Sequence, residues 1–93
     1  MEKQDTLEKE KIITVDLLWF SVLAEHRGKR SERITLSGGI TAGGLVDRLA
    51  AETPIVARYR PYLRVAVNQA YVDEDTILGD DDEIALITPV SGG

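Results

Sequence analysis

The sequence ends in five residues with little side-chain bulk, Pro89, Val90, Ser91, Gly92 and Gly93. Proline cannot donate to a sheet ladder, and glycine loses the most conformational freedom on ordering, so we expect a strand that stops here and a mobile arm. The carboxylate of Gly93 is an anion at neutral pH and could attack an activated phosphate. From Gly92-Gly93 alone, a frayed terminus without function is the simpler interpretation.

Other residue types that carry chemistry are scarce. His26 is the only histidine and there is no cysteine, which argues against a catalytic triad or a thiolate metal site. The glycines at 38, 39, 43 and 44 do not match a phosphate-binding loop, and the acids at 73–75 and 80–83 do not match the EF-hand spacing. We therefore predict no metal site, no bound cofactor and no catalytic side chains of the chain's own.

Length and charge restrict the class of protein. A chain of 93 residues has room for one domain with one modest core. The net charge of -5 argues against nucleic acid and favours a cationic protein partner. No apolar run is long enough for a membrane span and no signal sequence is evident, so a cytoplasmic location is expected.

The hydrophobic pattern predicts an α+β domain. Residues 1–11 should form a charged, disordered extension, and residues 12–93 a single domain whose tail is 90–93. Strands are expected at 12–20, 31–36, 63–68, 70–72 and 84–87. Ser21 should cap a short helix at 22–27 that Gly28 ends, and Thr41 should cap a longer helix that runs to about residue 53. That helix would pack across one face of a mixed sheet.

Period-two alternation divides the strand residues between two faces. The predicted core is formed by Val15, Leu17, Trp19, Ile34, Leu36, Leu45, Leu49, Val65, Val67, Ile84 and Leu86. The opposite face carries Leu18, Phe20, Ala66, Ala85 and Ile87, which is too apolar for a surface exposed to water. If these strands are neighbours, this face lies beside the start of the tail and marks a protein interface.

Three local predictions concern the loops. Asn68-Gln69 should form a tight turn, and 73–75 and 80–83 two acidic turns, with Ile77-Leu78 as an apolar plug beneath the loop. Gly43 and Gly44 should allow the helix to approach the sheet closely. The arginines at 58, 60 and 64 should be solvated or pair with the acidic loops.

The motifs resemble a known family. Val65-Ala66-Val67-Asn68-Gln69, the acidic turn before Ile84 and the ending Pro89-Val90-Ser91-Gly92-Gly93 are similar to the MoaD/ThiS family of sulfur carriers, which includes the small subunits of molybdopterin synthase and has the ubiquitin-like β-grasp fold. The resemblance covers about 12–93. Thr88 stands where the commonest family ending has a first proline.

The resemblance implies a chemistry for Gly93. Its carboxylate would be adenylated with ATP by a ubiquitin-activating-like adenylyltransferase, converted to a thiocarboxylate with a sulfurtransferase as sulfur source, and used to build the dithiolene of molybdopterin from cyclic pyranopterin monophosphate. A large subunit would supply the catalytic side chains in a heterotetramer. The expected partner contacts are Leu18, Phe20, Tyr71, Ala85 and Ile87.

Three alternatives stay open at this point. A carrier for thiamin or tungsten-cofactor synthesis would use the same Gly93 chemistry. A ubiquitin-like modifier would join Gly93 to lysines of target proteins. A purely structural interaction domain would not need Gly92-Gly93 at all.

Overall fold

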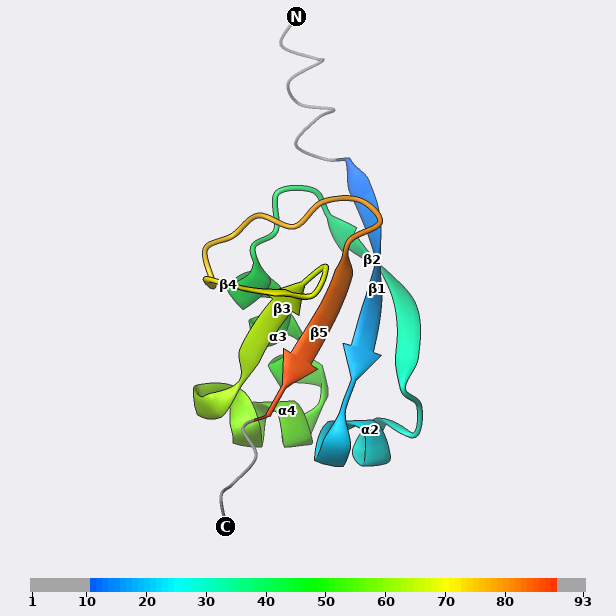
Figure 1. Cartoon of the computed structure of the whole chain (residues 1–93), viewed down its shortest axis with the longest axis vertical. Coiled ribbons are helices and arrows are strands. Elements are labelled where there is room, and N and C mark those ends of the chain that lie inside the picture. The colour runs from blue at the N-terminus through cyan, green and yellow to red at the C-terminus, as the bar shows by residue number, and fades with distance from the viewer. Residues whose placement is uncertain (1–10, 89–93) are drawn as a thin grey trace, which may run out of the picture.

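The computed structural model describes residues 11–88, so residues 1–10 of the extension predicted at 1–11, and the tail residues Pro89, Val90, Ser91, Gly92 and Gly93, lie outside the described residues. In chain order the elements are β1 (Ile12–Trp19), α2 (Ser21–Arg27), β2 (Ser31–Ser37), α3 (Ala42–Glu52), α4 (Pro54–Tyr59), the 3-10 turn η1 (Arg60–Tyr62), β3 (Arg64–Val67), β4 (Ala70–Val72) and β5 (Glu83–Ile87) (Figure 1). In this range no helix is long and apolar enough to cross a membrane.

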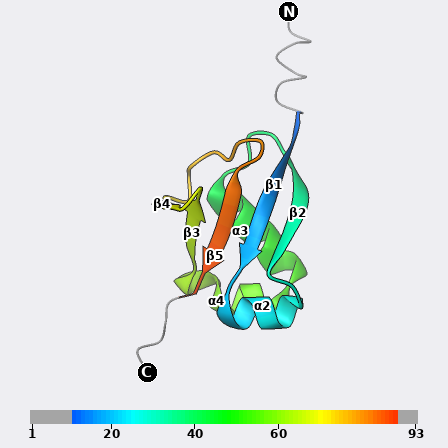
Figure 2. The same ribbon diagram turned by 45° about the vertical axis from the view of Figure 1, so that its right-hand side comes forward.

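The five strands form one mixed sheet in the order β2-β1-β5-β3-β4. The central pair, β1 and β5, is parallel, and every other neighbouring pair is antiparallel. Helix α3 lies behind the sheet, and α2 and α4 lie at the end where β1 and β5 finish, so the face opposite α3 is left open (Figures 1 and 2). The predicted α+β architecture is confirmed.

The core lies between the sheet and α3. Alternate residues of β1, from Ile13 to Trp19, are buried and the residues between them are not, as period two requires. Ile34 and Val67 are only partly buried at its margin. The prediction missed several buried residues that the helices and the segments next to them contribute: Leu23, Val56 and Leu63.

The short helix begins differently from the prediction. Ser21 is the first residue of α2 and not its cap, and its φ of 51° places it in the left-handed region. Phe20 is the N-cap, in extended backbone, and its carbonyl accepts from the amides of Leu23 and Ala24. The C-terminal end is as predicted, because Gly28 has a φ of 77°.

The longer helix is fixed at its start by two contacts. The hydroxyl of Thr41 accepts from the amide of Gly44 at 3.0 Å, which confirms the predicted cap. The amide of Gly43 donates to the carbonyl of Glu74 at 2.8 Å, so the close approach is to the loop after β4 and not to the sheet. In that loop Leu78 is buried as predicted, but Ile77 is 66% exposed, so it is not part of a plug.

Arg60 ties the same loop to the helices. Its guanidinium donates two hydrogen bonds of 2.8 Å to Glu74 and one of 2.9 Å to Asp47. These bonds raise the pKa of Arg60 above its ordinary range and lower the pKa of Glu74. The prediction that the basic residues pair with the acidic loops is confirmed for Arg60.

Candidate functional site

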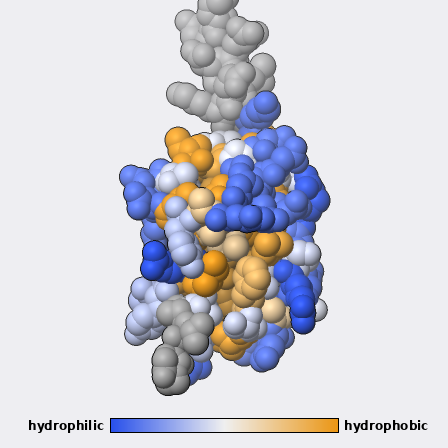
Figure 3. Space-filling view, in the orientation of Figure 1, coloured by the Kyte–Doolittle hydropathy of each residue, from blue (hydrophilic) through white to orange (hydrophobic). Residues whose placement is uncertain are grey.

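The open face of the sheet carries a shallow apolar groove. Cα pairing across β1, β5 and β3 places Leu18, Ala85 and Ala66 side by side, and Tyr71 of β4 follows next to Ala66. A hollow of about 370 Å³ is lined by Leu18, Phe20, Ala66, Gln69, Tyr71, Glu83, Ala85 and Ile87. We call these eight residues the docking groove. Figure 3 shows apolar side chains gathered on this face with hydrophilic surface around them.

The structure therefore brings together all five residues that the sequence predicted as partner contacts. Leu18 and Ile87 are partly buried, Ala85 is buried, and Phe20 and Tyr71 are 45% and 59% exposed. Large exposed aromatic side chains next to small ones are typical of residues that anchor a protein interface. Strand β5 ends at Ile87, so the groove lies where the chain continues towards Gly93.

Phe20 stands between two hollows. One of them is the docking groove. The other, with a volume of about 740 Å³, is lined by residues of α2 and its flanking loops, and Leu18 and Phe20 line both hollows. Because Phe20 is also the N-cap of α2, the position of its ring depends on how that helix is held.

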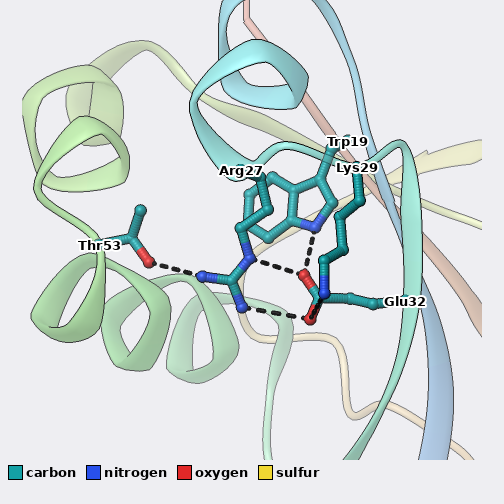
Figure 4. A network of polar contacts seen from close by, with 5 residues as sticks. All are labelled: Trp19, Arg27, Lys29, Glu32 and Thr53. Atoms are coloured by element: carbon teal, nitrogen blue, oxygen red, sulfur yellow. Dashed lines mark hydrogen bonds and ion pairs between the residues drawn. The ribbon is translucent and has the colours of Figure 1, made fainter.

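A polar network holds α2 against the rest of the domain (Figure 4). Glu32 of β2 accepts from the indole Nε1 of Trp19 at 2.6 Å and from Arg27 Nε at 2.7 Å and Nη2 at 3.2 Å. Arg27 also donates to the hydroxyl of Thr53, between α3 and α4, at 3.2 Å. Hydrogen bonds from Arg27, and then Trp19, hold the pKa of Glu32 below its usual range, although partial burial opposes the shift.

Sequence reasoning missed this network and part of the groove. Gln69 and Glu83 line the hollow but were not predicted, whereas Ala66 was predicted on this face. Strand alternation could have found Glu83, which lies two residues before Ala85 on the same face. The Arg27–Glu32 pair joins a helix to a strand, and no spacing rule points to it. His26 is exposed, and its Nδ1 lies 3.2 Å from the carbonyl oxygen of Val22.

The polar groups that line the groove are the Glu83 carboxylate, the Gln69 amide and the Tyr71 hydroxyl. Among residues 11–88 no three histidine or acidic side chains are placed to hold a metal ion. The groove offers apolar contact area, one carboxylate, one amide and one hydroxyl, which suits a protein surface. The predicted reactive residue, Gly93, lies outside the described residues, as do Gly92, Ser91, Val90 and Pro89.

The sheet order, the helix across one face and the open apolar face define the ubiquitin-like β-grasp class of proteins. The chain belongs to the ThiS family, whose model matches residues 17–93.

Two similar relatives are molybdopterin synthase sulfur carrier subunits. The one from Mycobacterium tuberculosis is 34% identical over 83 residues, which cover 88% of this chain and 100% of that protein. The one from Homo sapiens is 39% identical and covers 85% of this chain and 93% of that protein. Among solved structures, SAMP1 from Haloferax volcanii is 28% identical with a TM-score of 0.70, covering 86% of this chain and 99% of that one.

Proposed function

We propose that the chain is the sulfur carrier subunit of a molybdopterin synthase. The observation that carries the proposal is the near full-length similarity to relatives with that role from organisms as distant as a bacterium and a human. The groove on the open face and the family match through Gly93 support it.

The carried sulfur would be held on Gly93. A carboxylate is unreactive towards sulfur nucleophiles until it has a good leaving group. Attack of the Gly93 carboxylate on the α-phosphate of ATP, in the active site of an adenylyltransferase, would release pyrophosphate and give an acyl adenylate. A persulfide on a sulfurtransferase would then attack the acyl carbon and displace AMP. A second thiol would attack the resulting acyl disulfide, releasing the thiocarboxylate and forming a disulfide on the donor side. That sulfur would pass to cyclic pyranopterin monophosphate in the large subunit, and two rounds would complete the dithiolene.

The docking groove would bind the partners, with Phe20 and Tyr71 as anchors and Leu18, Ala85 and Ile87 between them. A groove of this size accommodates one partner at a time. The adenylyltransferase and the large subunit would therefore bind in turn, and the carrier would have to leave the first before it meets the second.

Intact-mass analysis of the protein from its native host tests the proposed chemistry. A thiocarboxylate in place of the carboxylate adds about 16 Da, because sulfur replaces one oxygen. A variant that lacks Gly93 is the control and should show no such addition. If the Gly93 deletion still supports cofactor synthesis in a living cell, the proposal is wrong.

A ubiquitin-like modifier is the second candidate, and the similarity to SAMP1, a small archaeal modifier protein, favours it. It predicts conjugates of higher mass in immunoblots of the native host that disappear when Gly93 is deleted. If the protein from the native host carries a thiocarboxylate and no such conjugates are found, its function is sulfur transfer and the modifier role is wrong.

A further inference from the structure

The two ends of the docking groove carry opposite charges. Glu83 lines it at the start of β5, and Ile87 lines it at the end of β5. Arg64 of β3 pairs with Ile87 across the sheet, and alternation places it on the same face as Ala66. The apolar centre therefore has the Glu83 carboxylate at one end, and Arg64, which does not itself line the hollow, borders its other end next to Ile87.

The acidic end has more carboxylates than cations. Asp16 and Glu83 are Cα partners on neighbouring strands of the open face, and like charges in adjacent cross-strand positions are unfavourable. Arg33 donates to Asp16 at 2.9 Å and to Asp81 at 3.0 Å, so it is already shared. Within residues 11–88 no lysine or arginine forms an ion pair with Glu83. This end therefore favours an incoming cation.

The basic end carries an arginine that stacks on Tyr71 and forms no ion pair with a carboxylate among residues 11–88. The Arg64 guanidinium lies 4.6 Å from the centre of the Tyr71 ring, a cation–π arrangement that orients an exposed side chain. In the part of the chain that the structure describes, Arg27, Arg33, Arg48 and Arg60 pair with carboxylates, whereas Arg64 does not. An arginine held on an aromatic face can still donate to a carboxylate in its plane.

We propose that this polarity fixes the direction in which a partner segment occupies the groove. The inference rests on the proposed function, and the occupant is the large subunit of molybdopterin synthase. Its segment places apolar side chains on Leu18, Phe20 and Ile87, a lysine or arginine at the Glu83 end, and an aspartate or glutamate on Arg64. A reversed segment leaves charges of like sign opposed in a desolvated interface, which is strongly unfavourable.

The test is calorimetric titration of the full-length chain with the purified large subunit from the same organism, at low and high salt. We expect Arg64→Glu and Glu83→Lys each to weaken binding about tenfold or more at low salt and less at high salt, because charge pairs at an interface are screened. Arg64→Gln should give a smaller loss. The matched control is Arg58→Glu, which makes the same charge change at an exposed position of α4 outside the groove and should bind within about twofold of the wild type.

The outcomes separate this inference from the proposed function. Trp19 fluorescence first shows that each variant is folded. If Phe20→Asp abolishes binding while Arg64→Glu and Glu83→Lys bind like the wild type, the groove is the docking surface but the proposed charge polarity is wrong. If Arg58→Glu weakens binding as much as Arg64→Glu, only net charge matters and the polarity is again wrong. If Phe20→Asp itself binds normally, the groove is not the docking surface, and the inference about its polarity is wrong as well.

Discussion

Replacing Glu32 by glutamine should destabilise the domain by loosening α2. The Glu32 side chain is 14% exposed and accepts three hydrogen bonds, two from Arg27 and one from the Trp19 indole. Glutamine keeps one acceptor oxygen but presents an NH2 group to donors. Hydrogen bonds to charged groups contribute about 1.5–3 kcal/mol, and one oxygen is retained, so we expect a loss of about 1.5–2 kcal/mol in the free energy of unfolding. For a domain of this size that lowers Tm by about 10 °C.

The loss should depend on pH in a defined direction. The pKa of Glu32 is lowered in the folded state, so its contribution is present above the unfolded-chain value of about 4.3. The contribution declines as the pH falls through the lowered folded pKa, because the carboxyl group is then protonated in both states. The difference between wild type and Glu32→Gln should therefore be full at pH 7 and shrink towards pH 3.

Urea unfolding at several pH values measures both effects. The chain has one tryptophan, and Trp19 is 2% exposed, so its fluorescence reports loss of the core. Glu25→Gln is the matched control, since it makes the same change at an exposed position of α2 and should leave stability unchanged. Equal stability of Glu32→Gln and wild type at pH 7, or a difference that stays constant down to pH 3, would refute the reasoning.

Two further substitutions test the backbone. Gly43→Ala should lower the free energy of unfolding by about 1 kcal/mol, because a Cβ there would lie 3.0 Å from Glu74 Cβ and 3.2 Å from the Glu74 carbonyl oxygen, and this overpacking exceeds the gain in helix propensity. A rise in urea midpoint would show that the loop can move away. Gln69→Gly should raise the free energy of unfolding by about 0.5–1 kcal/mol, because Asn68 and Gln69 have φ values of 51° and 73° and Asn-Gly is the preferred pair in such a turn. A lower urea midpoint would mean that the Gln69 side chain stabilises the fold.

Much of the open face was predictable from alternation alone. The inward positions of β1 fix which of its side chains lie on the open face. The same holds in β5, where Ala85 and Ile87 alternate with the inward-facing Ile84 and Leu86. Joining these residues into one groove also required the strand order, which alternation does not give and the structure shows to be β2-β1-β5-β3-β4. The tight turn at Asn68-Gln69 followed from local residue preferences.

What escaped prediction depends on contacts between distant segments. Serine is a common N-cap, but Ser21 adopts a left-handed conformation because the chain must turn sharply from β1 into α2. Ile77 and Leu78 are equally apolar, and only the path of the loop decides that Leu78 faces inward. The contact of Gly43 with Glu74 likewise depends on where the loop crosses the helix.

The parallel pairing of β1 with β5 has a consequence for biosynthesis. β5 lies between β1 and β3 and buries Ile84 and Leu86 completely, so the sheet cannot close before the ribosome has released nearly the whole domain. Pairings of such high contact order also form late and slowly. A nascent chain stalled before β5 would lack both the central strand and three of the eight groove residues, Glu83, Ala85 and Ile87. Partners that recognise this face would thus engage only chains whose translation has passed Ile87.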